Sequence, residues 1–116
     1  MTKNNQSYMM PLSTLQYKNA YGANVYRAGD LNLPIRMEKI LAMDDPPDFV
    51  QVITWNDGPE GHYIGNLWLE QNNDTAPMRY ANQLQWSHHP WQALITTFLV
   101  TYKNGGKAID MAPVDG

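Results

Sequence analysis

Two acidic residues, Asp57 and Glu60, lie three positions apart on a turn that contains Gly58 and Pro59. Hydrolysis of an acetal needs one protonated carboxyl for the leaving oxygen and one ionised carboxylate that activates water or attacks carbon. In an extended strand this spacing points the two side chains to opposite faces, whereas a turn brings both toward one cleft. The pair therefore predicts a glycosidase site. The alternative is an Asx-turn at Asn56 or Asp57 with a solvated Glu60.

Aromatic and histidine side chains flank the two acids. Trp55 and Trp68 have flat faces that match the axial C–H face of a pyranose, so both are candidates for stacking on sugar rings. His62 and Tyr63 could hydrogen-bond a substrate hydroxyl or tune the pKa of a carboxylate. The alternative for all four residues is structural, with the tryptophans in the core and the His-Tyr pair holding the loop.

Other kinds of chemistry find little support in the sequence. His88 and His89 are adjacent and point apart, and no cysteine or spaced partner completes four ligands, so we predict no metal site. The pair is expected to cap or pack against the helix that follows. Neither a phosphate-binding glycine loop nor a G-x-S-x-G motif occurs, which leaves phosphoryl and acyl transfer without a candidate site.

The composition limits the possible partners. The chain has 116 residues, a formal charge of −3 and only 16% charged residues, so it lacks the clustered Lys and Arg of a surface for nucleic acid or an anionic membrane. Four Trp, seven Tyr and two Phe are many for this length and suit either buried elements or a sugar-binding surface. No apolar segment approaches the roughly 18 residues of a membrane span, and residues 1–6 lack the apolar run of a signal peptide.

The first half of the chain predicts a strand, a helix and a second strand. Residues 8–12 form a short apolar run that contains Pro11, typical of a strand end, and residues 13–30 are expected to be a long irregular loop on the binding side. Leu33 to Met43 has helical periodicity, with Asn32 as its expected cap. Phe49 to Trp55 is rich in β-branched residues and apolar on both faces, which favours a buried parallel strand.

The second half is expected to be a loop and then a helix. The loop is more than thirty residues long and contains a possible helical turn over residues 80–86. The helix begins at Pro90, and its apolar residues continue at helical spacing to Tyr102. Gly105 can end it in the left-handed conformation.

This order of elements predicts an α/β fold in which two βα units share a parallel sheet. A buried strand followed by a carboxylate-bearing loop is how (β/α)8 barrels present catalytic residues. Such a barrel needs roughly 200 to 250 residues, so the chain is expected to be a partial (β/α)8 (TIM) barrel of two to three βα units. Residues 1–116 would then be one fragment of a catalytic barrel, with residues 1–7 disordered.

The run from Thr54 to Gly65 resembles the signature of glycoside hydrolase family 71, the fungal endo-α-1,3-glucanases or mutanases. Residues 8–13, 26–31 with Arg36, and 90–105 resemble other parts of the family in the same order. The resemblance covers residues 8–106. The turn that carries Glu60 departs from the family pattern in two places. Gly58-Pro59 stands where the family has an aromatic or small residue followed by Gly, and Gly61 stands where it has Ser. These differences alter the conformation in which the turn holds Glu60.

The resemblance implies inverting hydrolysis of α-1,3-glucan in fungal cell walls or similar polymers, without a cofactor. It implies a protein that is secreted or in the cell wall, and whose partner is the glucan rather than a nucleic acid or membrane. It places the catalytic acids at Asp57 and Glu60, with Glu60 expected to be the proton donor. The expected substrate-binding residues are Trp55, Asn56, His62, Tyr63, Trp68 and Asp30.

Two alternatives to an active enzyme remain. The chain could be a non-catalytic glucan-binding piece that uses Trp55, Tyr63 and Trp68, or an inactive truncated product. For the hydrolase, the missing remainder of the barrel is the expected partner, because so short a piece buries too little apolar surface to offset its ordering entropy.

Overall fold

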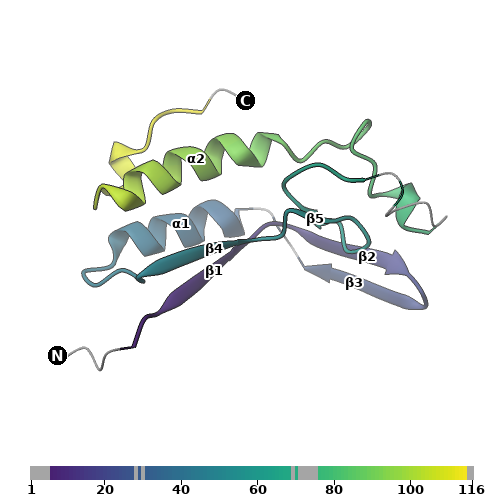
Figure 1. Cartoon of the computed structure of the whole chain (residues 1–116), viewed down its shortest axis with the longest axis horizontal. Coiled ribbons are helices and arrows are strands. Elements are labelled where there is room, and N and C mark those ends of the chain that lie inside the picture. Colours follow the sequence, from purple (N-terminus) through teal and green to yellow (C-terminus); the bar gives the residue numbers. More distant parts are fainter. Residues whose placement is uncertain (1–5, 28, 30, 69, 71–75, 115–116) are drawn as a thin grey trace.

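The computed structural model describes residues 6–27, 29, 31–68, 70 and 76–114 (Figure 1). The expected disorder of residues 1–7 therefore falls largely outside the described residues. Residues 6 and 7 are exposed and belong to neither a helix nor a strand.

A parallel strand pair is at the centre of the fold. Strand β1 (Met9–Ser13) pairs with β4 (Phe49–Ile53) in a register that runs from Met9↔Phe49 to Ser13↔Ile53. Helix α1 (Asn32–Ala42) connects them, which is the predicted strand–helix–strand unit. Because the strands are parallel, their carboxyl ends lie at the same edge, and the segments that follow both strands start there (Figure 1).

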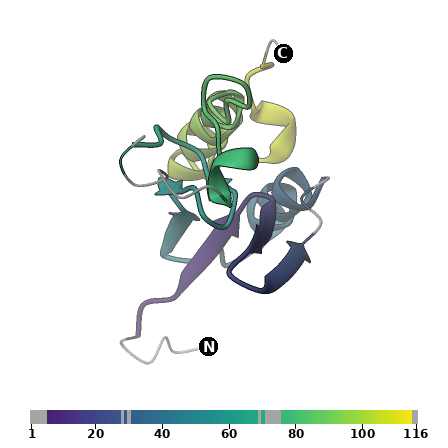
Figure 2. The ribbon, with the colours of Figure 1, turned by 90° about the vertical axis from the view of Figure 1, so that its right-hand side faces the viewer.

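Two helices cover one side of this pair. Helix α1 and helix α2 (Pro90–Lys103) lie on the same side of β1 and β4, as the end-on view also shows (Figure 2). Between them lies the core, where each fully buried aliphatic or aromatic side chain contributes roughly 1.5–3 kcal/mol relative to exposure. The core residues are Leu12, Leu33, Met37, Ile40, Leu41, Ile64, Ile95 and Phe98.

The ends of the helices match the predictions in part. Helix α2 begins at Pro90 as expected, and Gly105 just beyond it has a φ of 66°, which confirms the left-handed termination. The predicted capping role of Asn32 is wrong. The cap residue is Leu31, which makes no side-chain capping bond, and Asn32 already lies in the helix with its backbone N–H donating to Gly29 O at 2.8 Å.

The expected irregular loop over residues 13–30 is also wrong. Most of it forms an antiparallel hairpin of β2 (Gln16–Ala20) and β3 (Ala23–Arg27). The turn residues Tyr21 and Gly22 have φ values of 56° and 74°, the two positive values that a tight hairpin turn requires. Tyr is uncommon at a turn position with positive φ, so the sequence does not indicate this turn.

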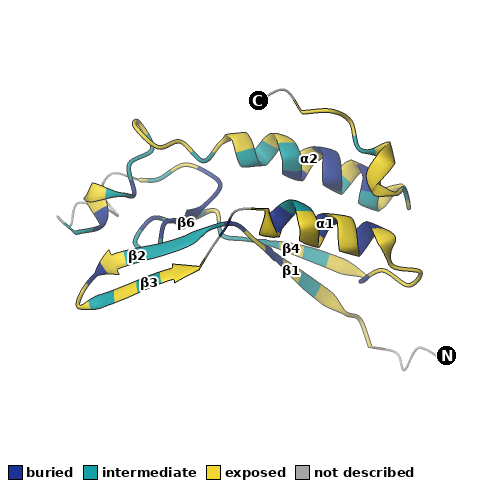
Figure 3. Ribbon diagram, turned by 180° about the vertical axis from the view of Figure 1, so that it is seen from behind, coloured by how far each residue is buried: buried dark blue, intermediate teal, exposed yellow. Residues whose placement is uncertain are grey.

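Two smaller elements carry the segment after β4. Strands β5 (Asn56–Asp57) and β6 (His62–Tyr63) form a short antiparallel hairpin, of which β6 is buried (Figure 3). The helical turn expected over residues 80–86 is present as a short turn in which Asn82 O accepts the N–H of Gln85 at 3.2 Å and that of Trp86 at 2.6 Å. A 3₁₀ helix precedes it at Pro77–Arg79. A further 3₁₀ helix, Ala108–Asp110, follows α2.

The fold class is thus mixed α/β, as predicted, and the barrel stays a prediction. Among the described residues, neither helix is long and apolar enough to cross a membrane.

Candidate functional site

The short hairpin after β4 holds both candidate acids. Asp57 pairs with His62 across the hairpin, and Glu60 lies in the turn between them. The turn closes with a hydrogen bond from Gly61 N–H to Gly58 O at 2.8 Å. Gly61 has a φ of 59°, and a Cβ atom there would lie 2.9 Å from the backbone oxygen of Tyr17. Glycine at position 61 therefore allows the tight turn to approach its neighbour.

Backbone hydrogen bonds fix Asp57 within this turn. Its own N–H donates to Thr54 Oγ1 at 3.1 Å, and its carboxylate accepts the backbone N–H of Glu60. This second bond holds the turn locally, but it reaches three residues along the chain, one more than the Asx-turn of the structural alternative. It nevertheless leaves Asp57 next to a second carboxylate, so the structural and chemical interpretations are compatible.

The surroundings of Asp57 raise its pKa. Burial raises the pKa of Asp57 above its ordinary value of 3.8, and the negative charge of Glu60 raises it further. The Glu60 backbone N–H and the charges of His62 and Lys18 act in the opposite direction without cancelling the rise. A general acid needs a raised pKa, because the carboxyl then keeps its proton to higher pH.

Glu60 is held by residues that the sequence did not single out. Gln16 donates a hydrogen bond from Nε2 to Glu60 Oε2, and Lys18 Nζ lies 3.7 Å from Glu60 Oε1. Backbone contact accompanies them, since Tyr17 N–H donates to Glu60 O at 2.8 Å. The available signal was that Gln16 and Lys18 are two apart and share one face if the segment is a strand. An irregular loop, as expected for residues 13–30, would not place these two side chains on one face.

Trp55 is placed as an exposed platform. Its side chain is 57% exposed, and its indole ring lies against Gly65, where a Cβ atom would come within 2.3 Å of Cε2. Gly65 N–H also donates to Trp55 O at 2.8 Å. One face of the ring is thereby supported by backbone, which suits stacking on a ligand by the other.

The remaining expected substrate-binding residues differ in exposure. Trp68 is 65% exposed, and Asn56 is half-buried in β5. Asp30 lies outside the described residues.

His62 and Tyr63 are buried and have partners within the protein. His62 Nε2 lies 2.6 Å from Ser13 Oγ, which ties the hairpin to the end of β1. Tyr63 is fully buried, and its hydroxyl donates to Trp86 O at 2.8 Å. Their geometry favours the structural alternative, in which both support the hairpin from behind.

The two histidines before α2 make separate contacts. His88 stacks on the ring of Tyr63 with centroids 3.8 Å apart, and its Nδ1 lies 2.8 Å from Tyr63 O. Burial lowers the pKa of His88 below 6.5, so the neutral ring is favoured. His89 Nε2 contacts Asn66 Oδ1 at 2.7 Å. Across the described part of the chain, no three His, Cys, Asp or Glu residues cluster as metal ligands would.

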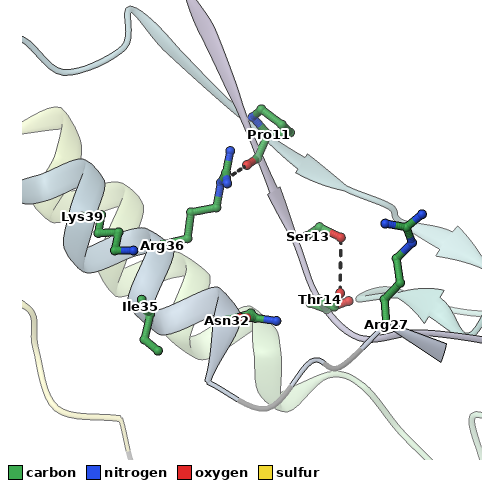
Figure 4. A pocket seen from close by; sticks show the side chains of 8 residues that line it. All are labelled: Pro11, Ser13, Thr14, Arg27, Asn32, Ile35, Arg36 and Lys39. Carbon is green, nitrogen blue, oxygen red and sulfur yellow. Dashed lines mark hydrogen bonds between the residues drawn. The ribbon is translucent and has the colours of Figure 1, made fainter.

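Two hollows differ in their relation to the acids. One of about 580 Å³ lies between β1 and α1 and includes three basic residues, Arg27, Arg36 and Lys39 (Figure 4). Arg36 Nε donates to Pro11 O at 2.8 Å there, and neither acid lines this hollow. Its nearest link to the acids is Ser13, which lines it and contacts His62, the residue paired with Asp57.

The second hollow, of about 380 Å³, adjoins the acidic turn. Its wall includes Gly61, and Tyr80, which also lines it, donates its hydroxyl to Pro59 O at 2.7 Å. The rest of its lining is mainly aromatic: Leu15, Tyr17, Arg79, Trp86 and His88.

Comparison with known proteins gives one family and two relatives. The model of glycosyl hydrolase family 71 matches residues 1–114. A mutanase of Penicillium rubens is 34% identical over 77 residues, which are 66% of this chain and 16% of the mutanase. A glucan endo-1,3-alpha-glucosidase of Schizosaccharomyces pombe is 28% identical over 99 residues, which are 84% of this chain and 22% of the glucosidase.

The chain thus spans about a fifth of the length of these relatives. No solved structure gives a significant match.

Proposed function

Because the chain belongs to glycosyl hydrolase family 71, we propose that it supplies the two catalytic acids for hydrolysis of α-1,3-glucosidic bonds in α-1,3-glucan. The observation that carries the proposal is the pair Asp57 and Glu60 on one turn, in electrostatic contact and with different surroundings. The names of the two relatives support the substrate.

The proposed mechanism is a single displacement with inversion. Water loses a proton to one carboxylate while its oxygen bonds to the anomeric carbon, and the bond from that carbon to the glycosidic oxygen breaks. The other carboxyl gives its proton to the leaving oxygen. One bond forms, one breaks, and two shorter glucans result. Proton exchange with solvent then restores both carboxyls.

The surroundings of the two acids favour Asp57 as the proton donor and Glu60 as the base. Asp57 has the raised pKa, whereas Glu60 receives a hydrogen bond and an ion pair that are made with a carboxylate. This assignment reverses the expectation, taken from the resemblance, that Glu60 is the donor.

Substrate contacts are proposed for the exposed residues around the hairpin. Trp55 and Trp68 would stack on glucosyl units, since both rings are more than half exposed. Asn56 and Asp30 remain proposed hydrogen-bonding partners. His62 and Tyr63 would act behind the hairpin, because their side chains are buried.

We further propose that the chain works as two to three βα units of a (β/α)8 barrel. The acids follow the carboxyl end of β4, which is the end at which such barrels hold their catalytic residues. The remainder of the barrel is the proposed partner, and a secreted or cell-wall location with fungal α-1,3-glucan as target goes with it. The proposed mechanism uses no cofactor.

A second candidate function is glucan binding without catalysis, favoured by the exposure of Trp55 and Trp68. It predicts that the chain sediments with insoluble α-1,3-glucan even when both acids are replaced. Loss of sedimentation in Trp55→Ala and Trp68→Ala variants would support it.

The proposed reaction is tested by placing the chain in a complete family 71 barrel and digesting α-1,3-glucan. Proton NMR at early times should show β-anomeric reducing ends, as inversion of an α-bond requires. β-1,3-Glucan, as a matched polymer, should stay intact. Newly formed α-anomers would overturn inversion, and equal release from both polymers would overturn the substrate.

A further inference from the structure

We propose that Gln16 and Lys18 are positioning residues that hold the Glu60 carboxylate as an oriented anion beside Asp57. The inference rests on the proposed function and deepens it, since it names residues on a separate hairpin that prepare the base. We call these two residues the β2 clamp.

The clamp engages both oxygens of the carboxylate. Gln16 Nε2 donates to Oε2, while Lys18 Nζ lies 3.7 Å from Oε1. A contact to a single oxygen would leave the group free to rotate about its terminal bond. Separate partners on the two oxygens restrict that rotation, so the geometry specifies an orientation as well as a charge.

The strand that carries the clamp is docked on the turn that carries Glu60. Tyr17, between the two clamp residues, donates its N–H to Glu60 O at 2.8 Å. Its ring meets Tyr80 edge-on with centroids 5.1 Å apart, and Tyr80 in turn donates its hydroxyl to Pro59 O at 2.7 Å. The clamp and its target therefore form one packed unit, and the contact is built before substrate arrives.

The chemistry of the clamp matches the need of a general base. An amide N–H and an ammonium group both bind a carboxylate more strongly than a neutral carboxyl. The Lys18–Glu60 pair is partly exposed, with side chains 25% and 35% accessible, so water still reaches the anion. The charge of this anion also adds to the rise in the pKa of Asp57 that burial causes, which is the direction that a general acid needs.

Lys18 is itself held in place. Its Nζ lies 5.7 Å from the centroid of the Tyr21 ring at the hairpin turn. This cation–π contact joins the Lys18 side chain to the turn of its own hairpin.

The first test is the carbon NMR shift of the Glu60 carboxyl at one neutral pH, in a complete barrel that carries this chain. Lys18→Met and Gln16→Leu should each move the signal, because each removes the partner of one carboxylate oxygen. Lys18→Arg should keep the signal close to that of the parent, and Lys39→Met on the exposed side of α1 should leave it unchanged. A signal that stays at the parent position in Lys18→Met and in Gln16→Leu would overturn the clamp.

The second test is the pH dependence of kcat/KM in a complete barrel. Lys18→Met and Gln16→Leu should move the acidic limb of the profile to higher pH and lower kcat/KM at the optimal pH several-fold. Lys18→Arg should have a profile close to that of the parent. A merely structural role would lower the rate without moving the limb, and that result would overturn the proposal. So would a shift of the alkaline limb alone, because it would make Glu60 the acid.

The two tests fail separately. If no barrel hydrolyses the glucan, the proposed function is wrong, while the NMR signal of the Glu60 carboxyl still decides whether Gln16 and Lys18 hold the anion.

Discussion

The indole ring of Trp55 lies against the backbone of Gly65, so closely that a Cβ atom at position 65 would be 2.3 Å from Cε2. The same two residues share a hydrogen bond from Gly65 N–H to Trp55 O at 2.8 Å. The ring of this exposed tryptophan next to the acidic hairpin therefore packs on backbone, which restricts its orientation.

Gly65→Ala should displace this ring and weaken glucan binding. We expect a loss of roughly three- to tenfold, the range that one aromatic stacking contact supplies. Sedimentation with insoluble α-1,3-glucan measures it, with Trp55→Ala as the matched variant. Because both changes remove the same platform, the double variant should bind no worse than Trp55→Ala alone. A double variant whose loss of affinity equals the product of the two single losses would contradict the shared platform.

Asp57→Asn should stabilise the chain at neutral pH. A group whose folded pKa is raised stabilises the fold fully below its unfolded value, here 3.8, and loses that contribution as the pH rises through the folded pKa. At pH 7 the ionised Asp57 is therefore unfavourable, and Asn relieves it while keeping an acceptor for the Glu60 N–H.

We expect the Tm of Asp57→Asn to exceed that of the parent by about 2 °C at pH 7, because a few tenths of a kcal/mol of unfolding free energy shifts Tm by about this much in a chain of this length. Below pH 3.8 the two Tm values should be equal. Calorimetry at the two pH values measures this. A lower Tm for the variant at pH 7 would contradict the prediction.

His88 should make the stability of the chain fall in mild acid. Burial lowers its pKa below 6.5, so the stability is fully present above 6.5 and is lost as the pH falls through the folded pKa. His88→Phe keeps a ring to stack on Tyr63 and removes the titration. Tm measured from pH 7.5 to 5 should therefore decline less in the variant, whereas parallel curves would show that other groups cause the decline.

Gly61→Ala should destabilise the chain more than Gly22→Ala. Both positions have positive φ, at 59° and 74°, but a Cβ atom at Gly61 meets Tyr17 O at 2.9 Å and one at Gly22 meets nothing within 4 Å. We expect about 1 kcal/mol for Gly22→Ala from backbone strain alone and about 2–3 kcal/mol for Gly61→Ala. Urea unfolding measures both, and equal losses would contradict the close approach of the turn to β2.

The elements that the sequence predicted well are those with long apolar periodicity. Helices α1 and α2 bury residues at helical spacing, so their place in the chain follows from burial. Strand β4 is parallel as predicted, but its expected burial on both faces is wrong: Phe49 is exposed, and Val50 and Val52 are only partly buried against the core. The parallel pairing of β1 with β4 followed from the helix between them.

The parts that the sequence did not reveal depend on contacts between distant segments. Hairpin β2–β3 is closed by Tyr21 and Gly22 in left-handed conformations, and β2 is held to the acidic turn by Tyr17 N–H on Glu60 O. The clamp on Glu60 joins residues more than forty positions apart. Likewise, the burial of Tyr63 depends on His88 and Trp86, which local composition does not encode.

The central claim is that Asp57 and Glu60 together break the glucosidic bond. Its most direct measurement is the release of reducing sugar from insoluble α-1,3-glucan by a complete barrel carrying Asp57→Asn or Glu60→Gln, with Glu38→Gln on the exposed face of α1 as control. We predict that each acid variant loses at least about a hundredfold, as expected for removal of a general acid or base, while the control keeps its activity. Turnover that survives in both acid variants would contradict the account.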